Sequence, residues 1–193
     1  MSDAKHTPSD YTLEAYLGDV RSILDKESDP AVFTASIKPL AQRLAASPAM
    51  QDPAYRVCDE EQGFGAHLLH EEDQHELAVL MFAWLPDRGT PPHNHETWAV
   101  VAVVEGEECE THFVRKDDGS KAGYAELEKT SDGMMRAGDV SVCMPQGIHS
   151  VWNKSDKLSI SLHTYGKHIN FTGRSSFDPE NKTETPYLVT VED

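Results

Sequence analysis

Residues 91–95 have the sequence Pro91-Pro92-His93-Asn94-His95. In an extended segment, side chains at positions i and i+2 point to the same side, so His93 and His95 can approach one cation together. His149 offers a third imidazole, because it follows a Pro-Gln-Gly turn at the start of another predicted strand. Three neutral imidazoles suit iron, zinc, copper or nickel, and they leave positions open for a substrate. The His-x-His pair alone is a weak signal on a chain with ten histidines.

Short predicted strands separated by turn residues surround this segment. Many short strands without an intervening helical period predict an all-β sandwich or barrel. We expect Ser131-Asp132-Gly133 to be a turn and residues 175–185 to be irregular. The predicted strands cover residues 66–69, 77–84, 98–104, 109–114, 124–128, 140–144, 149–153, 158–165 and 187–191.

The first 46 residues instead have the apolar periodicity of helices. Thr7-Pro8 and Asp29-Pro30 are both helix-start signals, and Pro39 is expected to kink the second helix or end its first part. The sequence therefore predicts a mainly β fold with two N-terminal helices. We divide it into a helical segment, 1–54, packed on a barrel, 55–193, within a single structural domain.

Composition and charge narrow the class of protein. The 193 residues include 33 Asp and Glu but only 17 Lys and Arg, a formal charge of −16. Such an acidic chain is not expected to bind nucleic acid or anionic membranes. The longest apolar run, Leu77 to Leu85, is too short to span a membrane. The N-terminus lacks the apolar core of a signal peptide and the three cysteines are scattered, so we expect a cytoplasmic protein.

A second signal is the alternating segment Ser161-Leu162-His163-Thr164-Tyr165. On a strand, Ser161, His163 and Tyr165 share one face. Ser161 can then fix the tautomer of His163, and His163 can orient the Tyr165 hydroxyl. The acidic segments Glu105-Gly106-Glu107-Glu108 and Asp117-Asp118-Gly119 are expected to be solvated turns, and the cysteines are expected to be core thiols.

The order of residues around the histidines resembles the two sequence motifs of the cupin superfamily. The resemblance implies a cupin double-stranded β-helix barrel in which His93, His95 and His149 hold the metal. Most cupins have a Glu ligand shortly after the histidine pair, but residues 98–101 contain no acid, so the implied site has three histidines only. The matching residues are Gly89, His93, His95 and Gly106 for the first motif and Gly138, Pro145, Gly147, His149 and Asn153 for the second.

With the Ser-x-His-x-Tyr strand included, residues 55–187 resemble the thiol dioxygenases, the cysteine dioxygenase family of cupins. The resemblance implies an Fe(II) cofactor and two partners, a small thiol substrate and O2, whose atoms are both added to sulfur to give a sulfinate. It also implies that Tyr165 positions the sulfur or oxygen species, with His163 and Ser161 as support.

The position of an arginine distinguishes the branches of this family. Mammalian-type cysteine dioxygenases have a carboxylate-binding Arg upstream of the histidine pair, and the matching segment 66–70 has none. Their Cys, crosslinked to the catalytic Tyr, is also missing at Ala99 or Val100. Bacterial 3-mercaptopropionate dioxygenases place the Arg after the catalytic Tyr, which matches Arg174. The resemblance therefore implies that Arg174 holds the substrate carboxylate, with Arg88 as a second candidate.

Several alternatives stay open from the sequence. Cysteine and mercaptosuccinate are alternative substrates within the family. A three-histidine cupin that cleaves a carbon substrate such as a diketone would need the metal but not the Ser–His–Tyr strand. A non-catalytic sensor or storage cupin would consume no oxygen with any thiol. The sequence does not predict the oligomeric state.

Overall fold

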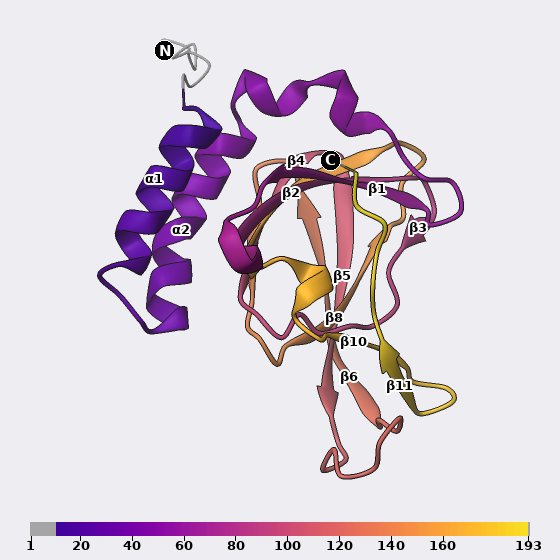
Figure 1. Ribbon diagram of the computed structural model, residues 1–193. Coiled ribbons are helices and arrows are strands. Elements are labelled where there is room, and N and C mark those ends of the chain that lie inside the picture. Colours follow the sequence, from indigo (N-terminus) through magenta and orange to yellow (C-terminus); the bar gives the residue numbers. More distant parts are fainter. Residues whose placement is uncertain (1–10, 193) are drawn as a thin grey trace, which may run out of the picture.

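The computed structural model describes residues 11–192, in which two helices precede a barrel of β-strands (Figure 1). The helices are α1 (Leu13–Leu24) and α2 (Pro30–Ala45), followed by two short 3-10 helices, η1 (Pro48–Gln51) and η2 (Pro53–Arg56). The later 3-10 helices are η3 (Asp73–His75) and η4 (Ile169–Phe171). The strands are β1 (Phe64–His70), β2 (Glu76–Trp84), β3 (Arg88–Gly89), β4 (Ala99–Glu105), β5 (Glu107–Arg115), β6 (Leu127–Arg136), β7 (Val140–Cys143), β8 (Ile148–Asn153), β9 (Ser159–Lys167), β10 (Ser175–Asp178) and β11 (Thr183–Pro186).

The strands form two main sheets and one hairpin. One sheet has the order β1-β2-β9-β4-β7, the other has the order β3-β8-β5-β6, and β10 pairs with β11. From β1 to β9, consecutive strands pass from one sheet to the other, except at the β1–β2 and β5–β6 hairpins. All the named pairs are antiparallel. This order is that of an eight-stranded jelly roll, with β1 added at one edge. The prediction of a mainly β, double-stranded β-helix with two helices is confirmed.

The two helices pack against the sheet that contains β4 and β9. Ile37 and Leu44 of α2 lie in one apolar core with Val100 of β4 and Leu162 of β9. Tyr16 of α1 is fully buried and its hydroxyl shares a 2.6 Å hydrogen bond with the Thr164 hydroxyl of β9. The helices therefore cover the outer face of β9, and the opposite face of this strand points into the barrel.

The helix boundaries differ in part from the prediction. Thr7-Pro8 lies outside the described residues, and α1 is capped by Thr12, whose side chain accepts from the backbone N–H of Ala15. Asp29 caps α2 as predicted, but Pro39 lies inside a helix that continues to Ala45. The apolar face of α2, buried on the barrel, outweighs the loss of one backbone hydrogen bond at Pro39. The division into segments 1–54 and 55–193 remains a prediction.

Three predictions of local structure were wrong. The expected turn Ser131-Asp132-Gly133 lies within β6, an edge strand whose exposed side chains have no apolar alternation. Residues 175–185 form the β10–β11 hairpin, anchored by the buried ring of Phe177. Residues 187–191 are not a strand, because side-chain amides replace regular pairing there: Asn170 bonds both the N–H and the C=O of Val189.

Candidate metal centre

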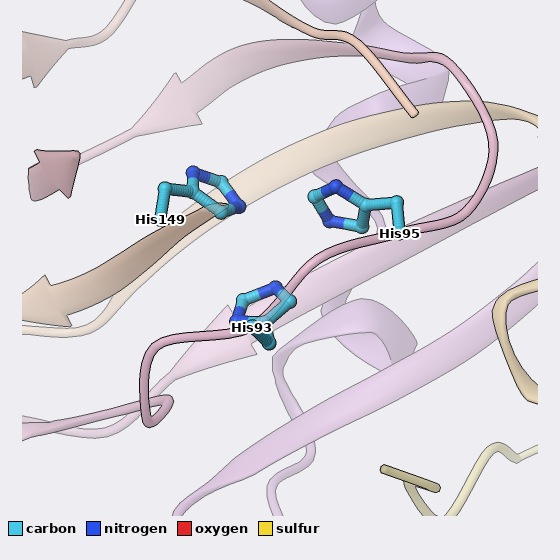
Figure 2. A group of neighbouring side chains, drawn as sticks. All are labelled: His93, His95 and His149. Atoms are coloured by element: carbon cyan, nitrogen blue, oxygen red, sulfur yellow. The ribbon is translucent and has the colours of Figure 1, made fainter. Parts of the chain in front are cut away.

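The three predicted ligands lie together inside the barrel, with their rings turned toward one another (Figure 2). One ring nitrogen from each of His93, His95 and His149 lies within 4.8 Å of the others, and each residue is less than 5% exposed. His93 and His149 are neighbours because their backbones exchange two hydrogen bonds, of 2.8 and 3.0 Å. This contact joins the segment before β4 to β8, which the sequence separates by more than fifty residues.

The protonation of two of these histidines, His93 and His95, suits a metal ion. Burial, and then the charge of neighbouring histidines, holds the pKa of both His93 and His95 well below the usual range, so both imidazoles are neutral. The neutral form is the one that binds a metal. The Nδ1 of His93 lies 2.9 Å from the carbonyl of Pro91, which orients this ring and leaves Nε2 free. Among the described side chains, the buried Nδ1 of His95 is one of three buried polar atoms without a hydrogen-bond partner.

Two side chains that sequence reasoning did not place at the site lie beside His149. The Glu110 carboxylate on β5 is 3.5 Å from Nδ1 of His149, and the Cys143 thiol on β7 is 3.9 Å from it. Burial alone would raise the pKa of Glu110, but the hydrogen bond and charge of His149 lower it overall. Burial likewise opposes ionisation of His149, but Cys143 and Glu110 raise its pKa overall. A buried carboxylate in this position orients the imidazole of a ligand.

A connected row of hydrogen bonds runs along the inward face of β9. Ser161 Oγ lies 2.8 Å from Nε2 of His163, and Nδ1 of His163 lies 2.7 Å from the Tyr165 hydroxyl. Nε1 of Trp84 donates to Ser161 Oγ at 3.1 Å. Burial, and then the charge of His149, lowers the pKa of His163 to about 3, while burial raises the pKa of Tyr165. Both rings are therefore uncharged near neutral pH, and Tyr165 lies 5.6 Å from His95 between ring centroids.

Arg174 points into the same interior space from the segment after η4. It is 4% exposed, its Cζ lies 4.3 Å from the centroid of the Tyr187 ring, and its Nε donates to the Tyr187 carbonyl at 3.2 Å. Burial lowers its pKa. Within residues 11–192, its buried Nη2 has no hydrogen-bond partner. Arg88, the second candidate, is exposed and does not line this space.

The space enclosed by these groups is small. Its volume is about 20 Å³, room for roughly one water molecule. Its polar lining is Thr90, the three histidines, His163, Tyr165 and Arg174, and the remaining lining residues are aromatic or aliphatic. No carboxylate of the described chain lines it. The cavity therefore brings together a cation, two phenols and a metal-ligand set, and it has to widen to admit a molecule larger than water.

The prediction of a solvated turn at residues 105–108 was wrong at its last residue. Glu108 is 1% exposed and begins the inward-facing pair Glu108 and Glu110 of β5. The i, i+2 spacing of these acids was the signal that could have placed both inside the barrel. The charge of these two acids alone favoured exposure to solvent, because buried carboxylates are rare unless they are paired.

Comparison with known proteins gives fold-level likenesses. No family model matches the chain. An oxalate oxidase solved with the substrate analogue glycolate aligns over 55% of this chain and 52% of its own, with 18% identity and a TM-score of 0.43. A Klebsiella pneumoniae protein with a double-stranded β-helix domain aligns over 57% and 81%, with 14% identity and a TM-score of 0.40. A cupin superfamily protein from Desulfitobacterium hafniense aligns over 54% and 78%, with 12% identity and a TM-score of 0.40.

The chain thus spans about half the length of the oxalate oxidase that it matches. Among the described residues, neither helix combines the length and the apolar character needed to cross a membrane. The cysteines Cys58, Cys109 and Cys143 form no disulfide. Strand order and interior geometry together describe a double-stranded β-helix barrel that encloses a group of three histidines able to hold a metal ion.

Proposed function

We propose that this chain is a non-haem Fe(II) thiol dioxygenase that converts a small thiol carboxylate, 3-mercaptopropionate in preference, to its sulfinate. The observation that carries the proposal is that three unlike groups line one small cavity. These are the three-histidine group, the Tyr165 hydroxyl and the unpartnered guanidinium nitrogen of Arg174. A cytoplasmic location, where cysteines stay reduced, is part of the same proposal.

The donor set fits a divalent metal. His93, His95 and His149 would hold it, because their nitrogens cluster, His93 and His95 are neutral, and two of the rings are oriented by Pro91 and Glu110. Imidazole alone does not select iron over zinc, copper or nickel; iron is what the family resemblance implies. Iron(II), when bound, would lower the pKa of the substrate thiol and activate dioxygen for transfer of both atoms to sulfur.

Arg174 would bind the substrate carboxylate. An orphaned guanidinium nitrogen in a nearly dry cavity is costly unless an acceptor reaches it, and a carboxylate matches the planar fork of arginine. Tyr187 fixes the guanidinium from one side through its ring and its carbonyl. The bound acid would then be held at a fixed distance from the histidines.

Tyr165 would orient the sulfur or oxygen species by a hydrogen bond. Its hydroxyl position is fixed by His163, and His163 is fixed by Ser161. The chain of contacts keeps the phenol oriented without solvent, because all three side chains are buried. A phenol kept neutral by burial can donate or accept, depending on which way its proton points.

The lining favours 3-mercaptopropionate over cysteine and mercaptosuccinate. The ammonium group of cysteine would need an acceptor, and no carboxylate of the described residues lines the cavity. The second carboxylate of mercaptosuccinate would need a second cation, and among the described residues Arg174 is the one Lys or Arg in the lining.

The test is oxygen uptake by protein purified without air and loaded with iron(II). The three thiols are compared by kcat/KM, and 3-mercaptopropionate is expected to rank first. Tyr165→Phe should lower the rate markedly. Wild-type protein that consumes no oxygen with any thiol would refute the proposal. If another thiol ranked first, the substrate assignment would be wrong. If Tyr165→Phe were fully active, a three-histidine enzyme acting on a carbon substrate would be favoured instead.

A further inference from the structure

The cavity beside the three histidines has a thin wall on one side. Tyr187 and Val189 both line the cavity, whereas Leu188 between them is 68% exposed. Among the described lining residues, Tyr187 is the one that is only half-buried. A single layer of chain, residues 187–192, therefore separates the interior from solvent here, and we call this segment the strap. In Figure 1 the strap is the yellow coil that runs from β11 back to β1.

Some part of the cavity wall has to move before a ligand can enter, because a volume of about 20 Å³ holds roughly one water molecule. Most of the lining residues belong to strands that are paired on both sides. Phe82 and Trp84 lie on β2, between β1 and β9, and His163 and Tyr165 lie on β9, between β2 and β4. Moving these residues would break backbone hydrogen bonds in the sheet, whereas moving the strap leaves both sheets paired.

The middle of the strap is held by two side-chain amides. Asn170 of η4 accepts from the N–H of Val189 at 3.0 Å and donates to the Val189 carbonyl at 2.8 Å. Gln62 accepts from the N–H of Thr190 at 2.7 Å and donates to the Thr190 carbonyl at 3.3 Å. A side chain can release such bonds by changing its rotamer, without any change in the sheets. We call these two amides the latches.

The two ends of the strap are held by backbone hydrogen bonds instead. At one end the N–H of Tyr187 donates to the Arg174 carbonyl at 3.0 Å. At the other end Glu192 is bonded to β1, where its N–H donates to the Ala66 carbonyl and its carbonyl accepts from the N–H of Leu68, both at 2.8 Å. The middle of the strap can therefore bend outward between two fixed ends, which moves the Val189 side chain out of the cavity wall.

We propose that the middle of the strap, residues 188–190, is the gate of this cavity, and that Asn170 and Gln62 keep it closed. Small ligands of the three-histidine group enter and leave when both latches release the strap. Arg174 stays in place during opening, because its Nε is bonded to the carbonyl of Tyr187 at the fixed end. The inference concerns the route of any small ligand, so it goes beyond the proposed reaction and does not depend on the thiol.

Hydrogen exchange tests the latches without any ligand. In each latch variant, the informative N–H is the one that the other latch holds. Asn170→Ala should speed the exchange of the Thr190 N–H about ten-fold, and Gln62→Ala should speed that of the Val189 N–H by a similar factor, because one opening frees both. The Glu192 N–H, at the fixed end, should keep its wild-type rate. If each variant affected only the N–H that it releases directly, the strap would not open as a unit and the proposal would be overturned.

Ligand entry is measured by stopped-flow absorbance, with azide as the ligand and cobalt(II)-loaded protein. Asn170→Ala should raise the association rate constant of azide by the same factor as the exchange of the Thr190 N–H, without weakening the affinity at equilibrium. Asn181→Ala is the matched control, because the Asn181 amide is exposed on the β10–β11 turn and bonds to Asp178. It should leave the association rate unchanged.

Two results would overturn the proposal. An unchanged association rate in Asn170→Ala, despite faster exchange of the Thr190 N–H, would show that ligands enter by another route. A weaker affinity without faster association would show that Asn170 only supports the fold of the site. If Asn170→Ala fails to fold, Gln62→Ala carries the same test, with the exchange of the Val189 N–H as its reference.

Discussion

Arg174→Lys perturbs the proposed carboxylate site with the least change in charge. Lysine keeps the positive charge but loses the planar fork, so one of two charge-assisted hydrogen bonds to the substrate is lost. Such a bond contributes about 1.5–3 kcal/mol, which corresponds to a loss of about 10- to 150-fold in kcat/KM. The stacking of the Arg174 guanidinium on the Tyr187 ring, at 4.3 Å, and its hydrogen bond to the Tyr187 carbonyl are also weakened. We therefore expect the loss in kcat/KM to lie toward the upper end of this range.

The assay is oxygen uptake with 3-mercaptopropionate, repeated with ethanethiol, which has no carboxylate. Arg174→Lys should reduce kcat/KM for the acid and leave the small rate with ethanethiol nearly unchanged. Arg88→Lys is the matched control, because Arg88 is exposed and does not line the cavity. Equal losses on both thiols, or an equal loss from Arg88→Lys, would refute the role of Arg174.

Three further predictions concern stability. Chelation of the metal should destabilise the protein by about 3 kcal/mol when free metal is at 100 times its Kd, measured as a fall in Tm that is absent in His149→Ala. Tyr16→Phe should cost about 1–2 kcal/mol in urea unfolding, because the buried Thr164 hydroxyl loses its partner, with oxygen uptake unchanged. Glu108 has its pKa raised from 4.5 to about 7, so its ionisation favours the unfolded state. The free energy of unfolding of the wild-type protein should therefore fall by about 3 kcal/mol as the pH rises from 4.5 to about 7. Glu108→Gln should remove this fall.

Local patterns were sufficient to predict the barrel. Strands such as β2 and β9 are buried on both faces or alternate strictly, and glycine and proline mark their ends, so the sequence alone indicated a mainly β fold. The His-x-His spacing and the Ser-x-His-x-Tyr alternation likewise depend only on strand geometry. That is why the structure brings each of these sets together as expected.

What the sequence did not predict depends on long-range pairing. Strand β6 holds its place by pairing with β5, with Thr111 bonded to Asp132, and not by its own apolar pattern. The i, i+2 spacing of Glu108 and Glu110 puts both on one face of β5, but the long-range pairing of β5 with β8 and β6 decides that this face points into the barrel. The segment 187–191 was predicted as a strand, but it is held by the amide of Asn170.

The central claim is that dioxygen chemistry takes place on sulfur in this cavity. The most direct measurement is mass spectrometry of the product formed from 3-mercaptopropionate and isotopically labelled dioxygen by the iron(II)-loaded protein. The account predicts a sulfinate in which both oxygen atoms carry the label. A product labelled from water, a disulfide with hydrogen peroxide, or no product at all would contradict it.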